Sequence, residues 1–277
     1  MRTRELGVVS VAIVDDESRG SKLARYRDLL LALTMRDVRV RYQQSILGIY
    51  WAVLNPLLMA LVWALVFTRV LRIGQDGRVP YVVFLFCSLS FWGLFANSVT
   101  SAVGSLTGNA SLLAKAAFPR VILPTASVAA RIFDLACSGL VLAAFMVAYH
   151  IPVGGHAWLV LPLVLLELVY ALGVAYLVAG LNVLFRDVQQ ILPVLLLAWM
   201  YVSPVLYTRT QIPAGLGGVL RINTPGALVG VITDSVLGYD LAGAGPIVLS
   251  ASLGAAVALG LGWMVFRHAE RLVSEVL

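Results

Sequence analysis

The sequence predicts an all-α integral membrane protein with six membrane-spanning helices, and three observations predict it. Of the 277 residues, 60% are hydrophobic and only 12% are charged, whereas about a quarter of the residues are charged in a typical soluble domain. Asp, Glu, Lys and Arg are absent from six long runs, which are 42–68, 79–114, 135–166, 168–185, 188–208 and 241–266. These runs approach or exceed the about 20 residues that a helix needs to cross a bilayer. They are also continuously apolar, without the alternation typical of a membrane β-barrel strand.

The N-terminal part of the chain divides into a tail and an amphipathic helix. Residues 1–22 lack the long apolar stretch and the small-residue cleavage site of a signal peptide, so we expect a retained cytoplasmic tail. In the helix predicted over 23–48, apolar side chains recur every three or four residues, opposite several arginines. We expect this helix to lie along the inner leaflet with its apolar face toward the acyl chains; a solvated linker is the alternative. The apolar stripe begins with Leu23, Tyr26, Leu29, Leu30 and Leu33, and Gly48 closes the helix.

Residues 49–277 are predicted to form one six-span membrane domain. The expected spans are 49–70, 80–103, 121–149, 157–182, 189–208 and 246–267. The third span contains Arg131 and Asp134, but a break there would leave two pieces too short to cross a bilayer. The apolar pieces between the fifth and sixth spans, such as PGALVGVITDSVLG, are also too short. We expect them to form re-entrant or interface-lying outer half-helices, with a plain hydrophobic loop as the alternative.

Basic residues indicate the orientation of these spans. Most of the 20 Lys and Arg residues fall before the first span, in the loops after the second and fourth spans, and after the sixth. Basic residues next to spans are retained in the cytoplasm. We therefore expect a multi-pass protein of the cytoplasmic (inner) membrane with both termini in the cytoplasm.

The sequence contains no motif for catalysis or nucleotide binding. There is no G-x-x-x-x-G-K-[ST] phosphate-binding loop, no H-E-x-x-H, and no plausible Ser-His-Asp arrangement. The three histidines have no further ligands nearby in sequence, so no metal site is predicted. Cys87 and Cys137 both lie in apolar runs, where a thiol usually serves as a small buried hydrophobe. We expect no enzymatic activity, no cofactor in this chain and no nucleic-acid partner.

Three ionisable residues at membrane depth are functional candidates because such groups are costly there unless they are paired or hydrated. Arg131 and Asp134 are three residues apart on one predicted helix, which favours an internal ion pair over a proton relay. Glu167 either hydrogen-bonds a neighbouring helix while protonated or faces a hydrated cavity. A scaffold or an ion-coupled carrier that uses these residues remains a possible function at this stage.

Aromatic side chains gather near the ends of the predicted spans. The ordinary interpretation is a belt at the level of the lipid head groups. The functional interpretation is a stacking surface for sugars, and we assign a candidate translocation path to Asn55, Trp63, Trp92, Trp199, Tyr201 and Tyr207.

Four stretches of the sequence form a specific combination. The first contains R-D-x-x-x-R-Y-x-x-S-x-L-G-x-x-W at positions 36–51, and the others are GNASLLAKAAFPRVILP, FRDVQQILPVLLLAWMYVSPVLY and INTPGALVGVITD. They are spread along the chain from position 36 to position 234. In them the sequence resembles the membrane subunits of type 2 ABC exporters for O-antigen, teichoic acid and related cell-surface polysaccharides.

The resemblance implies a homodimer of this chain that works with two copies of a separate ATPase subunit, on which ATP and Mg²⁺ bind. It also implies a coupling helix in the second of these stretches, around residues 111–118. Its apolar side chains would be buried against the ATPase and its basic ones would add charge complementarity. The residues assigned to coupling are Leu112, Leu113, Lys115, Phe118 and Arg120.

The resemblance further implies that the substrate is a lipid-linked glycan, which is exported across the membrane. It also implies that the chain contacts membrane lipid. A guanidinium group binds phosphate oxygens through two parallel N–H···O hydrogen bonds. We therefore assign binding of the lipid diphosphate to Arg36, Arg39, Arg41 and Tyr42. Contact with bulk anionic lipid or with the ATPase is the alternative for these arginines. The alternative function is an ABC efflux permease for small amphiphilic molecules, which shares the six-span plan.

Overall fold

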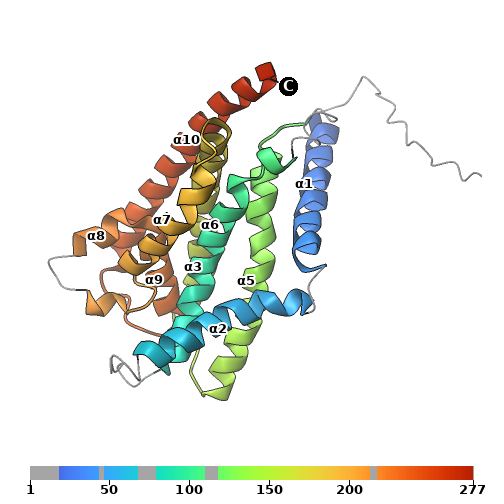
Figure 1. Cartoon of the computed structure of the whole chain (residues 1–277). Coiled ribbons are helices and arrows are strands. Elements are labelled where there is room, and N and C mark those ends of the chain that lie inside the picture. The colour runs from blue at the N-terminus through green and yellow to red at the C-terminus, as the bar shows by residue number, and fades with distance from the viewer. Residues whose placement is uncertain (1–18, 44–46, 68–78, 110–117, 213–216, 277) are drawn as a thin grey trace, which may run out of the picture.

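The structure is a computed structural model that describes residues 19–43, 47–67, 79–109, 118–212 and 217–276. Within these ranges the chain is helical and has no strand. Five helices there are long and apolar enough to cross a membrane, namely Gly48–Leu65, Tyr81–Val103, Ile122–Ala148, Ala157–Leu184 and Ala244–Arg271. The predicted all-α class is therefore confirmed, but the described residues give five candidate spans where six were predicted. Figure 1 shows how these helices are arranged.

Helix α3 (Tyr81–Val103) is the centre of the bundle. In the most apolar stretch of this helix, 78% of the residues are buried. The reason is that α2, α5, α6, α7 and α9 all pack against it. The sequence of α3 alternates large aromatic residues with Ser, Ala and Gly, and this mixture of sizes lets several helices approach it closely. The core therefore lies around α3, and its boundaries match the predicted span 80–103 to within one residue.

Helix α1 (Arg19–Tyr42) stands beside α5 (Ile122–Ala148), as Figure 1 shows. The predicted stripe is real in its middle, but protein covers it: Leu33 is buried, and Leu29 and Leu30 pack against a cluster that includes Ile122. The expectation that this face meets the acyl chains is therefore wrong for these three leucines. Hydrophobic periodicity shows that a face is buried, and it does not show whether lipid or another helix buries it.

Helix α2 (Trp51–Leu65) follows a sharp turn and crosses α5 and α3 (Figure 1). The turn occurs at Gly48, whose φ of +49° lies in the left-handed region that glycine adopts without strain. The helix predicted over 23–48 ends earlier, at Tyr42, and Gly48 instead begins the short 3-10 turn Gly48–Tyr50 that leads into α2. The turn also places the end of α1 next to the start of α2, which matters for the cavity described below.

Helices α6 (Val160–Leu184) and α10 (Ala244–Val276) form a parallel pair with very close backbones. A Cβ atom added at Gly173 would lie 2.7 Å from the Cα of Leu259, and one added at Gly180 would lie 3.1 Å from the Cα of Phe266. Helix α10 continues past the predicted end at residue 267. That boundary was predicted too early because charged residues end an apolar run without ending a helix.

Helix α7 (Val188–Val202) is shorter than the predicted span 189–208. Ser203 is extended because the following residue, Pro204, disfavours the helical conformation in the residue before it. Side chains of α3 then hold the non-helical segment: the Tyr81 hydroxyl donates to the carbonyl of Leu206 at 2.6 Å, and the Ser88 hydroxyl donates to that of Val205 at 2.6 Å.

Two short helices precede α10, namely α8 (Gly217–Ile222) and α9 (Thr224–Leu237). The Asn223 side chain caps α9 by accepting a hydrogen bond from the Gly226 amide at 3.2 Å. Nearly every residue of α9 is buried, and Arg209 forms a buried ion pair with Asp234. The segment is therefore a packed helix and not a plain exposed loop.

Candidate functional site

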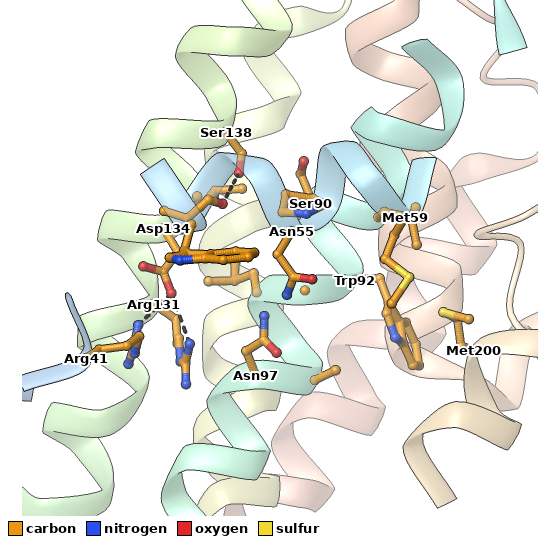
Figure 2. A pocket seen from close by; sticks show the side chains of 18 of the residues that line it. Arg41, Asn55, Met59, Ser90, Trp92, Asn97, Arg131, Asp134, Ser138 and Met200 are labelled. Carbon is orange, nitrogen blue, oxygen red and sulfur yellow. Dashed lines mark hydrogen bonds and ion pairs between the residues drawn. The ribbon is translucent and has the colours of Figure 1, made fainter. Parts of the chain in front are cut away.

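A cavity of about 540 Å³ opens between α2, α3, α5, α7 and the end of α1. Figure 2 shows three groups of side chains around it. Charged residues gather at one end, two asparagines face each other in the middle, and Trp92, Met59 and Met200 lie at the other end. The cavity thus combines a polar, cationic end with an apolar, aromatic end.

The charged end centres on the Asp134 carboxylate. Its Oδ2 accepts from Arg41 Nη1 at 2.6 Å and from Arg131 Nη1 at 3.1 Å, and its Oδ1 accepts from the Tyr42 hydroxyl at 2.6 Å. Arg131 also donates to the Ser101 hydroxyl through Nε at 3.1 Å and through Nη2. Three helices, α1, α3 and α5, are therefore joined at this point.

Two guanidinium groups share one carboxylate here, so the charged end of the cavity carries a net charge of +1. The side chains of Arg41, Arg131 and Asp134 are 23%, 16% and 16% exposed, which leaves them open to the cavity but shields them from bulk screening. Burial, and then the hydrogen bond to Asp134, raise the pKa of Tyr42 to about 12. The Tyr42 hydroxyl therefore keeps its proton and remains a donor. This arrangement attracts an anion.

The middle and far end of the cavity present polar and aromatic groups. Asn55 of α2 and Asn97 of α3 point toward one another across it (Figure 2). Trp51, Trp63 and Trp92 are also part of the lining. Amide groups and flat aromatic faces are suited to hydrogen bonding and stacking with an extended polar chain.

A family model for the ABC-2 type transporter matches residues 28–225. This chain belongs to the ABC-2 type transporter family. It is 30% identical over 204 residues to an O-antigen export system permease protein RfbA of Klebsiella pneumoniae, covering 73% of this chain and 77% of that protein. It is 35% identical over 192 residues to RfbA of Myxococcus xanthus, covering 69% and 72%. It is 25% identical over 189 residues to the polysialic acid transport protein KpsM of Escherichia coli, covering 66% and 70%. These similarities confirm the resemblance to type 2 ABC export permeases.

The fold brings five of the predicted site residues of this ABC-2 chain to one cavity. They come from two groups that the sequence analysis kept apart, the arginine-tyrosine group and the aromatic path. They are Arg41, Tyr42, Asn55, Trp63 and Trp92.

Other predicted site residues lie outside the cavity lining. Arg36 pairs with its neighbour Asp37 at 2.9 Å, and Arg39 is exposed. Trp199 donates to the Asn223 side chain at 2.7 Å and so ties α7 to the start of α9. Tyr201 stacks edge-on against Trp63, with 5.7 Å between ring centroids.

The remaining predicted residues have local roles or cannot be placed. The Tyr207 hydroxyl donates to the carbonyl of Val202 at 3.0 Å, inside its own turn. Among the coupling residues, Phe118 packs beside α1 and α5, and Arg120 donates to the carbonyl of Glu270 in α10 at 2.8 Å. Leu112, Leu113 and Lys115 lie outside the described residues.

Sequence reasoning missed several parts of the ABC-2 site. It assigned no role to Ser101 or Met200, it noted Trp51 only as the end of a sequence motif, and it paired Asp134 with Arg131 alone. The signal for Ser101 is weak, because a serine in an apolar helix usually bonds its own backbone. Glu167 is fully buried and does not line the cavity, and neither of its carboxylate oxygens has a hydrogen bond within the described part of the chain. The described residues also hold no group of three or more His, Cys, Asp or Glu side chains suited to a metal.

Proposed function

We propose that this ABC-2 chain is the permease subunit of an ATP-driven exporter for a cell-surface polysaccharide. The observation that carries the proposal is the family match over residues 28–225, together with about 30% identity to O-antigen export permeases over some 70% of the chain. The chain is a transport subunit, and ATP and Mg²⁺ are assigned to a separate partner subunit.

The cavity supports a sugar-containing substrate. Its tryptophans offer stacking faces, and Asn55 and Asn97 offer amide donors and acceptors. Its cationic end suits the phosphate of a lipid-linked glycan, which is the form of substrate that we propose. Two copies of this chain would together enclose the translocation path. The exposed apolar residues of α2 and α7, such as Leu58, Val62 and Ile191, suit either lipid or a second copy.

The proposal includes a membrane arrangement. Helix α7 with the segment that follows it would be a sixth crossing, and α8 and α9 would be outer half-helices. Both termini would then lie in the cytoplasm at the inner membrane. Residues 109–120 of each copy would dock one of two ATPase subunits. Arg120, at the end of this segment, donates to the carbonyl of Glu270 in α10.

Deleting the gene and restoring it on a plasmid tests the proposal. Loss of surface polysaccharide, with lipid-linked glycan accumulating inside the cells and an ATPase subunit copurifying with the tagged chain, is the expected result. Unchanged surface polysaccharide together with retention of amphiphilic dyes would instead favour an efflux permease for small amphiphiles. A chain that transports without any ATPase subunit would refute both.

A further inference from the structure

The charged end of the cavity has more hydrogen-bond donors than acceptors. Each guanidinium carries five N–H donors, whereas one carboxylate accepts at about four positions. Arg41 donates to Asp134 through Nη1, and within the described part of the chain its Nε and Nη2 groups have no hydrogen-bond acceptor. Arg131 is more fully used, because Ser101 holds Nε and Nη2.

Neighbouring carboxylates do not correct this imbalance. Asp37, one helical turn before Arg41, already pairs with Arg36 at 2.9 Å and accepts from the Ser127 hydroxyl at 3.4 Å. Asp134 is the acidic residue in the cavity lining, and it serves three donors at once. The spare donors therefore adjoin a space that has an excess of positive charge.

We propose that Arg41 and Arg131 bind a phosphate-type anion in this cavity, and that Asp134 occupies their shared position when the anion is absent. The anion would take over the Arg41 donors, while Ser101 keeps the guanidinium of Arg131 in place. A phosphate or diphosphate has more acceptor oxygens than a carboxylate. Two of its oxygens can accept parallel hydrogen bonds from one planar guanidinium group. The inference deepens the proposed function, on which it rests for the physiological ligand.

The walls of the cavity indicate the kind of molecule that carries the phosphate. Trp51, Met59 and Trp63 of α2 line the cavity. Trp92 and Met200 lie near Met59 at the end away from the charged residues (Figure 2). An ester with an apolar or sugar-bearing body therefore fits better than a small free ion. A lipid head group and a free phosphate share the same chemistry at the arginines, and the test separates them.

Displacing Asp134 also has a mechanical result. The contacts of Arg41 and Tyr42 with Asp134 are the described polar links between the end of α1 and the middle of α5. An anion that takes Arg41 from Asp134 replaces one of these links. Ligand binding would thereby loosen the end of α1, next to the turn at Gly48 that leads into α2.

The test measures binding by the full-length chain in phosphatidylcholine nanodiscs without ATP. The probes are farnesyl diphosphate, inorganic diphosphate and added phosphatidylglycerol, each titrated by calorimetry. Arg41→Gln should weaken farnesyl diphosphate binding at least about tenfold, as expected from losing a charge-assisted hydrogen bond. Arg27→Gln, at an exposed arginine of the same helix that lies outside the cavity lining, is the matched control and should change binding less than about twofold.

Asp134→Asn separates ligand binding from a structural role. If Asp134 competes with the anion, removing its charge should tighten binding, by about threefold or more. If the cluster only holds the helices together, the same substitution should weaken binding. Arg41→Lys keeps the positive charge but loses the planar guanidinium group, so its affinity should lie between those of the unchanged chain and Arg41→Gln. This variant replaces Asp134→Asn if Asp134→Asn fails to fold.

The outcomes are distinct. Stronger binding of farnesyl diphosphate than of inorganic diphosphate supports a lipid head group, and equal binding supports a free phosphate group. No binding of either, an Arg41→Gln effect below twofold, or an equal effect of Arg27→Gln overturns the inference. Diphosphate binding by a chain whose deletion leaves surface polysaccharide unchanged would refute the proposed function and leave the site standing.

Discussion

The close approach of α6 and α10 gives a prediction that can be worked out from the structure. A Cβ atom at Gly262 would lie 2.9 Å from the carbonyl carbon of Gly173 and closer still to its oxygen. Ordinary van der Waals contact begins near 3.4 Å. Both neighbouring atoms belong to the backbone, so no side chain can rotate away. In Gly262→Ala the two helices must therefore separate by about one ångström, because the contact with the Gly173 oxygen is the tightest.

This separation has a predictable cost. Overpacking of a well-packed core costs roughly 1–3 kcal/mol, and helix separation also removes contacts along both helices. The gain in helix propensity from Gly to Ala offsets about 1 kcal/mol of this at most. We expect Gly262→Ala to lower the free energy of unfolding by roughly 1–2 kcal/mol. Gly260→Ala is the matched control, because nothing lies within 4 Å of its added Cβ.

The assay is unfolding of the purified chain by SDS titration in mixed micelles, followed by far-ultraviolet circular dichroism. Gly260→Ala should be neutral or slightly stabilising, while Gly262→Ala should unfold at a lower SDS fraction. Equal stability of the two variants would show that α6 and α10 do not pack as described, and it would refute the reasoning.

Three further predictions follow from described contacts. Trp63→Ala and Trp92→Ala should each reduce surface polysaccharide roughly two- to tenfold, since an aromatic contact is worth roughly 0.5–1.5 kcal/mol; Trp158→Ala, which is 71% exposed and outside the cavity lining, is the control. Arg209→Ala should destabilise the chain by roughly 3–5 kcal/mol because it leaves Asp234 buried without its ion-pair partner. The double variant with Asp234→Asn should unfold at a higher SDS fraction than Arg209→Ala alone. Equal stability of the two variants would contradict this. Asn223→Ala should cost roughly 0.5–2 kcal/mol through loss of the α9 cap and should change the emission of Trp199, its hydrogen-bond partner; Asn97→Ala should leave that emission unchanged, and an unaltered spectrum in Asn223→Ala would count against the contact.

The sequence predicted the long helices well and their surroundings less well. The boundaries of α3 and α5 were accurate to about one residue, because a span in lipid or in an apolar core needs an unbroken apolar run. The same criterion placed α7 too far along the chain. Absence of charge does not reveal that Pro204 forces Ser203 out of the helix, nor that α3 supplies hydrogen bonds to the freed carbonyls.

The site was predictable in its residues and not in its assembly. The three-residue spacing of Arg131 and Asp134 predicted their ion pair, which the structure has at 3.1 Å. The partnership of Asp134 with Arg41 joins positions 93 residues apart. A local pattern carries no information about such a contact, because it depends on how α1 packs against α5.

Helix α3 makes contacts in three separate regions of the molecule. Near its start, Tyr81 and Ser88 hold the segment after α7; in its middle, Trp92 and Asn97 face the cavity; near its end, Ser101 fixes Arg131. An α-helix is stiff over this length of about 35 Å. A small axial rotation of α3 would therefore change the contacts in all three regions together.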